Sequence, residues 1–251
     1  MEDNIFVLQG LITESKAHKT PLALTFVDIE KAYDNVNREK LWRRLQEVKV
    51  PNQLIRLIQA LYHKTSRRVQ WEGWTTEAFI SHKGLRQGCP LSPILFAIYI
   101  AKVSEALDQQ QIGIHVDHMV ISHLMFADDV VLVSSQTAHT TTLLETLANT
   151  LNELDLHVNS DKSKMLRLGP GSYMKKEWRV ETSQGQLSIQ ELDEVKFLGV
   201  WVGKGRMYAR HMKKTAGKTA YAGAMTQATA SHTLVPQLAT EALWCQAKLP
   251  E

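Results

Sequence analysis

The fold of this chain is decided by the stretch Met125-Phe126-Ala127-Asp128-Asp129-Val130-Val131-Leu132-Val133. Two adjacent acids interrupt residues that favour buried strands. The pattern therefore predicts strands over 121–126 and 130–134, with the acidic pair at or beside a tight hairpin turn. A third acid, Asp28, ends the apolar run 22–27 in the same manner. Each acid lies at the end of an apolar strand, where a buried charge is costly unless a cation or a polar partner accompanies it.

On neighbouring strands, Asp28, Asp128 and Asp129 would repel one another strongly, and divalent cations would relieve that repulsion. Two such cations about 4 Å apart also stabilise the attacking and leaving oxygens of an in-line phosphoryl displacement. Mg²⁺ prefers carboxylate oxygens and completes its shell with water and substrate phosphates. A single Asp at a strand end is more often a turn former, and Asp pairs are common in hairpin turns. Only the conjunction of both sites favours metal-dependent phosphoryl chemistry.

The rest of the chain mixes helices and strands without a regular βαβ alternation, which favours the α+β class over a doubly wound sheet. Apolar periodicity predicts helices over 4–17, from about Asn37, from about Asn52, over 91–107 with Pro93 in the first turn, over 140–154, and from about residue 207 onward. Both Asn residues are candidate N-caps. Further strands are predicted over 112–116, 164–168, 187–189 and 195–202, with a hairpin over 69–80 around Glu72-Gly73.

The composition is that of an ordinary globular protein. The 251 residues carry a net charge of +3, with 44% hydrophobic and 22% charged residues, which excludes collagen-like repeats and extensive disorder. Two cysteines, Cys89 and Cys245, are too few for a disulfide framework or a Cys-based zinc module. The acidic start is unlike a secretory signal, and the longest apolar run, 93–101, is about half of what a membrane span needs. We therefore expect an intracellular protein that is not secreted and has no membrane partner.

The small net charge conceals an asymmetry between two parts of the chain. Residues 1–150 carry 15 basic and 16 acidic side chains, whereas residues 151–251 carry 14 and 10. The excess is greatest among six cations that have no acid between them, namely Lys204, Arg206, Arg210, Lys213, Lys214 and Lys218. Such a run attracts a phosphate backbone, although on charge alone a solvated helix face is the commoner interpretation.

Taken in chain order, five segments resemble the palm of a reverse transcriptase, and specifically that of non-LTR (LINE-like) retrotransposons. They are Phe26-Val27-Asp28-Ile29-Glu30-Lys31-Ala32-Tyr33-Asp34, Gly84-Leu85-Arg86-Gln87-Gly88-Cys89-Pro90-Leu91-Ser92-Pro93, Phe126-Ala127-Asp128-Asp129, Leu156-His157-Val158-Asn159 with Lys162, and Val195-Lys196-Phe197-Leu198-Gly199-Val200. The second is the most specific. The resemblance covers about residues 4–202. It implies an α+β polymerase palm with a mixed or antiparallel sheet backed by helices, partial fingers and the start of a helical thumb.

The resemblance also implies roles for individual residues. Asp28, Asp128 and Asp129 would be catalytic and would bind two Mg²⁺ ions, with Mn²⁺ as a possible substitute. The other implied contacts are nucleotide-binding for Tyr33, Gln87, Gly88 and Lys162, primer grip for Phe197, Leu198 and Gly199, and nucleic-acid backbone for the six cations above. Tyr33 would exclude a 2′-hydroxyl, and Gly88 would allow close backbone approach. Tyr33 as a core aromatic, Phe197-Leu198-Gly199 as a core strand ending in a bend, and Lys164 in place of Lys162 stay open as alternatives.

The expected function is RNA-directed DNA polymerase, acting on an RNA template, a DNA primer and dNTPs. We expect residues 1–203 to form the palm with residual fingers and residues 204–251 to begin a thumb. These short flanks favour a truncated piece of a longer polyprotein, which would supply the rest of the fingers and thumb, with an endonuclease as a further candidate segment, and they favour a weak or inactive polymerase. One alternative is a catalytically silent relic or repurposed copy that binds nucleic acid. Another is a different palm polymerase, such as a group II intron maturase or an RNA-templated RNA polymerase.

Overall fold

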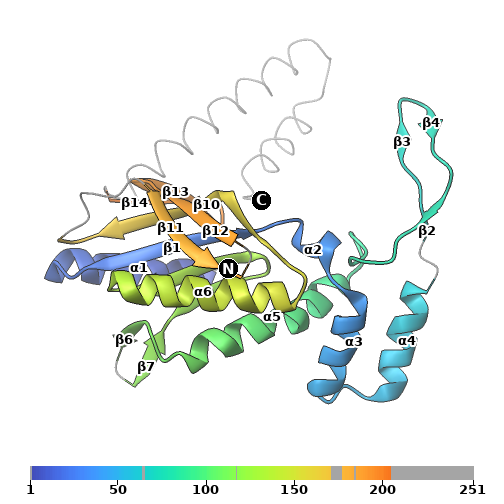
Figure 1. Cartoon of the computed structure of the whole chain (residues 1–251), viewed down its shortest axis with the longest axis horizontal. Helices are drawn as coiled ribbons and strands as arrows, with labels where there is room; N and C mark the ends of the chain where they lie inside the picture. Colours follow the sequence, from blue (N-terminus) through green and yellow to red (C-terminus); the bar gives the residue numbers. More distant parts are fainter. Residues whose placement is uncertain (1, 64–65, 117, 171–176, 184, 205–251) are drawn as a thin grey trace, which may run out of the picture.

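A six-stranded sheet of order β11-β12-β10-β1-β9-β8 forms the centre of the molecule (Figure 1). The computed structural model describes residues 2–63, 66–116, 118–170, 177–183 and 185–204. The sheet contains β1 (Leu22–Ile29), β8 (His123–Phe126), β9 (Asp129–Ser134), β10 (Val158–Leu168), β11 (Glu177–Thr182) and β12 (Gly185–Glu191). Neighbouring strands are antiparallel except β10 and β12, which are parallel. The predicted α+β class with a mixed sheet is confirmed.

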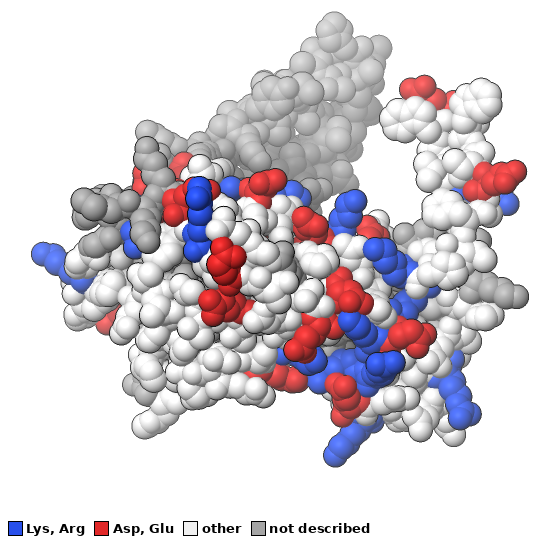
Figure 2. All heavy atoms as spheres, in the orientation of Figure 1, with Lys and Arg blue, Asp and Glu red and all other residues white. Residues whose placement is uncertain are grey.

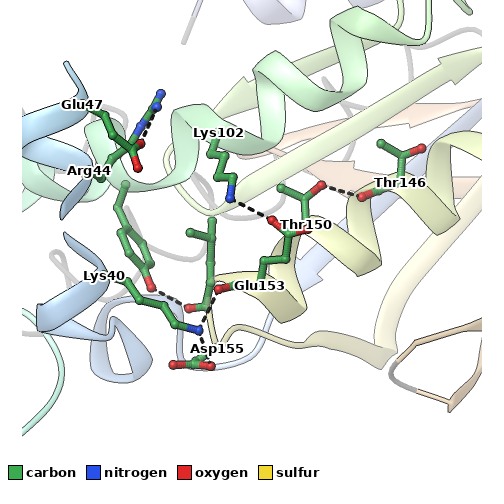
Figure 3. A network of polar contacts seen from close by, with 10 residues as sticks. Lys40, Arg44, Glu47, Lys102, Thr146, Thr150, Glu153 and Asp155 are labelled. Carbon is green, nitrogen blue, oxygen red and sulfur yellow. Dashed lines mark hydrogen bonds and ion pairs between the residues drawn. The ribbon is translucent and has the colours of Figure 1, made fainter.

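Six helices are described: α1 (Glu2–His18), α2 (Ala32–Asn35), α3 (Arg38–Glu47), α4 (Asn52–Tyr62), α5 (Ser92–Gln109) and α6 (Thr137–Glu153). Figure 1 shows α5 and α6 running along the sheet, with α3 and α4 side by side beyond its end. Figure 3 shows ion pairs in this helical layer: Lys40 with Asp155 at 2.7 Å, Lys102 with Glu153 at 2.8 Å, and Arg44 with Glu47. Arg44 of α3 also pairs with Glu105 of α5.

Side-chain alternation along β1 divides the core into two clusters. Val27 and Ile29 pack with the helical layer α3–α6, whereas Leu24 and Phe26 pack with α1 on the other face. The alternation places the side chain of Asp28 on the α1 face, because it follows Phe26 by two residues. The central position of β1 in the sheet explains why all its residues except Asp28 are buried.

Four two-stranded sheets complete the fold: β2 (Ser66–Arg67) with β5 (Phe79–Ile80), β3 (Gln70–Trp71) with β4 (Trp74–Thr75), β6 (Ile114–Val116) with β7 (Met119–Ile121), and β13 (Glu194–Phe197) with β14 (Val200–Gly203). The predicted hairpin around Glu72-Gly73 is confirmed, since Trp71 pairs with Trp74 across these two residues. Their φ angles of 43° and 86° are those of a left-handed two-residue turn. This hairpin projects away from the body of the molecule (Figure 1).

Three predictions about individual elements are corrected by the structure. The single strand predicted over 195–202 is wrong, because Leu198 and Gly199 form a turn with φ 46° and 81° that joins β13 to β14. The strand predicted over 164–168 begins earlier, at Val158. The helix α4 has Pro51 at its N-cap, and Asn52 is its first helical residue. By contrast, Asn37 caps α3, and its side-chain oxygen accepts a hydrogen bond from the Lys40 N–H at 3.2 Å.

None of the helices in the described part of the chain is both long and apolar enough to cross a bilayer. The predicted helical segment from residue 207 lies outside the described residues. The same holds for Arg206, Arg210, Lys213, Lys214 and Lys218.

Candidate active site

The three predicted carboxylates come from the adjacent strands β1 and β9 and from the turn that precedes β9. Strand β9 pairs with β1 up to Val27 opposite Val130, so Asp28 and Asp129 are the next residues along this register. Phe126 pairs with Asp129 across the β8–β9 hairpin, which leaves Ala127 and Asp128 as the two turn residues. The acidic pair therefore lies at a tight hairpin turn, as the strand pattern predicts.

The charges of these carboxylates act on one another. Burial, then the negative charge of Asp128 and then that of Asp28, raise the pKa of the Asp129 carboxyl above its usual value. Burial is the largest cause of this rise, and the contributions of Asp128 and Asp28 show in addition that the three carboxyls lie close enough for each ionised group to disfavour the next. The prediction that folding brings Asp28 together with the Asp128–Asp129 pair is supported by this coupling.

The donor chemistry at this sheet end fits a divalent cation, since carboxylate oxygens are preferred by Mg²⁺ and a cation would offset the mutual repulsion. The geometry of the acids is less favourable for a metal than their chemistry. Among the described residues, no group of three or more His, Cys, Asp or Glu side chains is arranged so that it could hold a metal ion. Asp28, Asp128 and Asp129 are thus gathered and coupled without forming a closed set of ligands.

Lys162, rather than Lys164, lies beside the acids. The Nζ atom of Lys162 is 3.9 Å from Asp28 Oδ2, and its side chain is 70% exposed. Such a pair contributes little to stability and leaves the ammonium free to reach a substrate. The Nζ atom of Lys164 instead donates to the backbone oxygen of Asp161 at 2.5 Å and to Gln190 at 3.4 Å.

Tyr33 is held next to the carboxylates by the one-turn helix α2. Its ring stacks on Phe96 of α5, with centroids 4.5 Å apart and an angle of 19° between the planes. Burial, and then the negative charge of Asp128, raise the pKa of the Tyr33 hydroxyl. Tyr33 is therefore a partly buried aromatic residue that packs on the core and that also lies near Asp128. Its place in the core does not exclude a role beside the nucleotide.

The Gly84–Pro93 segment is bound to α2 through its backbone. The N–H of Gly84 donates to Val36 O and that of Leu85 to Tyr33 O, both at 2.8 Å. The Gln87 side-chain amide is 3.4 Å from both carboxylate oxygens of Asp34. Gln87 and Tyr33 therefore belong to two segments that are joined by backbone hydrogen bonds.

Gly84 and Gly88 of this segment are required to be glycine for different structural reasons. A Cβ atom at Gly84 would lie 2.6 Å from Asp34 O, and φ there is +82°. A Cβ at Gly88 would meet no atom within 4 Å, although φ is +78°. Close backbone approach within the chain thus occurs at Gly84, whereas Gly88 needs only its left-handed conformation and faces open space.

Arg38 supports the same loop and has no signal in the sequence, because an Arg in the first turn of a polar helix is usually solvated. It is only 9% exposed. Its guanidinium donates to Gly84 O at 3.0 Å and to Ser81 O at 2.7 Å. It also lies over the ring of Tyr62, 5.1 Å from the centroid. A hydrophobic pattern identifies core positions, but only the fold reveals a buried Arg that satisfies loop carbonyls.

The predicted primer-grip residues lie at the β13–β14 hairpin. Phe197 is buried, and its ring centroid is 5.5 Å from that of Phe26, two residues before Asp28. Leu198 and Gly199 form the turn. The hairpin therefore packs on the sheet face to which Asp28 belongs. The one described member of the basic run, Lys204, has Nζ 2.8 Å from Asp193 and 3.7 Å from Glu191, so its charge is balanced by acids of the chain itself.

A mixed sheet that is backed by helices and carries coupled carboxylates at the ends of two adjacent central strands defines the palm of a polymerase. The fold comparison agrees. The apo telomerase structure from Candida tropicalis, truncated from the C-terminal domain, matches 80% of this chain and 37% of that chain with a TM-score of 0.56 at 16% identity. A second apo telomerase structure from the same organism gives a TM-score of 0.54 at 14% identity, over 80% of this chain and 34% of that chain. At this level of identity the likeness shows the fold alone.

The chain belongs to the reverse transcriptase (RNA-dependent DNA polymerase) family, whose model matches residues 2–202. It is similar to the Retrovirus-related Pol polyprotein of the type-2 retrotransposable element R2DM of Drosophila melanogaster, with 26% identity over 79% of this chain and 19% of that protein. The corresponding type-1 element R2 protein of Nasonia vitripennis is 28% identical over 79% of this chain and 20% of its own length. The chain thus spans about a fifth of the length of these relatives.

Proposed function

We propose that this chain is a template-directed DNA polymerase that copies RNA by adding dNTPs to the 3′-hydroxyl of a DNA primer. The observation that carries this proposal is the coupled set of carboxylates from β1 and the β8–β9 turn, in a chain of the reverse transcriptase family. Nucleotidyl transfer is an in-line displacement, for which positioning and charge stabilisation supply most of the catalysis.

Asp28, Asp128 and Asp129 are the groups that would hold the divalent cations, for which we propose two Mg²⁺ ions with Mn²⁺ as a substitute. When bound, such ions supply Lewis-acid activation of the primer hydroxyl and charge neutralisation of the triphosphate. The carboxylates themselves orient and balance these charges. The proposal therefore requires the three carboxylates to close around the ions when these bind.

The remaining roles belong to neighbouring side chains. Tyr33, held flat on Phe96 beside Asp128, would occupy the space of a ribose 2′-hydroxyl and so favour dNTPs. Gln87 and Gly88 would line the nucleotide pocket. Lys162, whose exposed ammonium is 3.9 Å from Asp28, would contact the triphosphate and donate a proton to the pyrophosphate that leaves. Phe197, Leu198 and Gly199 would support the primer terminus from the β13–β14 hairpin.

Primer extension with the purified 251-residue chain tests the proposal, using poly(rA)/oligo(dT), dTTP and Mg²⁺. Single-nucleotide addition is measured as well as longer synthesis. Asp128→Asn should abolish the weak extension that we expect of the parent chain, while primer–template binding changes by less than about twofold. Asp108→Asn, which changes an acid beside His123 and remote from the site, is the matched control. Extension by Asp128→Asn at the rate of the parent chain would refute the assignment.

A second candidate is a nucleic-acid-binding domain without catalysis. It is favoured by one observation, that the described acids do not form a ready ligand set for a metal. It predicts that the parent chain and Asp128→Asn bind primer–template equally and that neither extends it. Parallel reactions with rNTPs separate both candidates from an RNA-synthesising palm, since the Tyr33 position favours the deoxy substrate.

A further inference from the structure

The pairing of β10 with β1 is interrupted beside Asp28. Phe26 pairs with Lys164, but Asp28 pairs with Asn159, so Val27 alone lies opposite residues 160–163. The four residues 160–163 therefore form a bulge in β10 at the level of the first carboxylate. Such irregularities change the direction in which nearby side chains point, and they are common next to active sites.

Ser163 satisfies the backbone groups that this interruption leaves without ladder partners. Its Oγ atom accepts a hydrogen bond from the Asp28 N–H at 3.1 Å and donates one to Asn159 O at 2.7 Å. The side chain has no exposed surface. The buried hydroxyl of Ser163, which is 135 positions from Asp28 in the sequence, thus joins the backbone of Asp28 to Asn159, the residue that pairs with it.

The bulge is also closed by a local bond. The N–H of Lys162 donates to the side-chain oxygen of Asn159 at 3.3 Å. This bond holds the bulge in the form in which Lys162 faces Asp28. The position of the Asp28 carboxylate and that of the Lys162 ammonium are therefore both set by the same few residues, of which only Ser163 is fully buried.

We propose that Ser163 is a positioning residue for the active site, which holds the backbone of Asp28 so that its carboxylate meets the divalent cation. This inference rests on the proposed function of Asp28. Removal of the hydroxyl takes the acceptor from the Asp28 N–H and the donor from the Asn159 carbonyl at a partly buried position, so we expect the strand end to shift until other groups satisfy them. Substitutions of residues that orient a metal ligand generally lower metal affinity by about 10- to 100-fold.

The test compares Ser163→Ala with Ser134→Ala. Ser134 is a matched control because it is 2% exposed, belongs to the same sheet and forms a buried bond of 2.7 Å with the Thr140 hydroxyl, away from the carboxylates. Mn²⁺ binding by the full chain is measured by electron paramagnetic resonance without nucleic acid. Exchange of the Asp28 amide is followed by NMR, and thermal midpoints report on stability.

Ser163→Ala should weaken Mn²⁺ binding about 10- to 100-fold and speed exchange of the Asp28 amide at least about 10-fold. Ser134→Ala should change the Mn²⁺ affinity and the exchange rate of the Asp28 amide by less than about twofold, even if its thermal midpoint falls as much as that of Ser163→Ala. Ser163→Thr, which keeps the hydroxyl, should restore binding to within about threefold of the parent. If Ser163→Ala does not fold, Ser163→Cys, a similar volume with a weak hydrogen-bonding group, takes its place.

Equal Mn²⁺ affinities of Ser163→Ala and Ser134→Ala would overturn the inference, whatever the stability. If the affinities differ as expected but the parent chain does not extend primers, the proposed polymerase function fails and the positioning role stands. If the parent chain binds no Mn²⁺ at all, both the inference and the metal assignment of Asp28 are wrong.

Discussion

At the scale of single residues, Asp129 carries an electrostatic cost that the rest of the site imposes on it. Burial and the charges of Asp128 and Asp28 raise its pKa above the ordinary value of 3.8. A carboxyl whose folded pKa is raised destabilises the folded state when it is ionised. The cost is fully present above the folded pKa and disappears as the pH falls below the unfolded value. The active site therefore lowers stability at neutral pH in the absence of cations.

Asp129→Asn is expected to stabilise the metal-free protein at pH 7, because it removes one of three repelling charges. The gain should be below about 1 kcal/mol after solvent screening, or about 2 °C in melting temperature for a chain of this size. It should vanish below pH 3.8, where the parent carboxyl is also neutral. Calorimetry across this pH range checks the prediction. A gain that grows as the pH falls would show that repulsion is not its cause.

At the scale of elements, the site depends on how α3 and α4 hold the loop that contains Gln87. Arg38 of α3 donates to Gly84 O and Ser81 O and lies over Tyr62 of α4, so one guanidinium joins two helices to the loop. A planar fork with several N–H donors can satisfy several carbonyls at once, which an ammonium cannot. Position 84 has no room for a side chain, because a Cβ atom there would collide with the backbone of Asp34.

Arg38→Ala should lower the free energy of unfolding by about 2–4 kcal/mol, because it leaves buried carbonyls without donors. Arg38→Lys should recover little of this loss. Arg43→Ala, on the exposed side of the same helix, should stay within about 0.5 kcal/mol of the parent. Urea unfolding measures all three. A loss at Arg38 no larger than that at Arg43 would contradict the role of the guanidinium as the support of the loop.

At the scale of the whole molecule, basic and acidic side chains lie next to one another on the face drawn in Figure 2. Figure 2 shows acidic and basic side chains interleaved over the helical layer, where the pairs of Lys40 with Asp155 and Lys102 with Glu153 lie (Figure 3). The basic run that starts at Lys204 has no acid within it in the sequence, and all its members but the first lie outside the described residues. A phosphate backbone binds where cations are not already neutralised by neighbouring acids.

Replacing Arg206, Arg210, Lys213, Lys214 and Lys218 by Gln should therefore flatten the salt dependence of primer–template binding. The slope of log K against log salt should decrease in magnitude by about 0.7–0.9 for each phosphate that the variant no longer neutralises. The matched control is the double substitution of Lys40 and Lys102 by Gln, whose charges are already paired, and the slope should not change. Fluorescence anisotropy at several salt concentrations gives the slopes. Equal slopes for all three proteins would mean that the basic run is a solvated surface that does not contact the phosphate backbone.

Local pattern determines a good part of this protein. The acidic pair at a tight turn, the turn at Glu72-Gly73, the cap at Asn37 and the Pro93 start of α5 were all predictable, since each depends on residues a few positions apart. The strand at 195–202 was mispredicted because Leu198 lies within an apolar run and a non-Gly residue seldom adopts a left-handed conformation, which here accompanies the closing of the β13–β14 hairpin.

By itself, the sequence determined that three acids end apolar strands and that the motifs are those of a reverse transcriptase palm. Only the tertiary structure decided which contacts form in and around the site: Ser163 with the Asp28 amide, Lys162 rather than Lys164 at the Asp28 carboxylate, and the ring of Tyr33 stacked on Phe96. The physical reason is that these contacts join residues far apart in the chain. Their geometry follows from sheet register and burial, which depend on the whole core at once rather than on the spacing within any one segment.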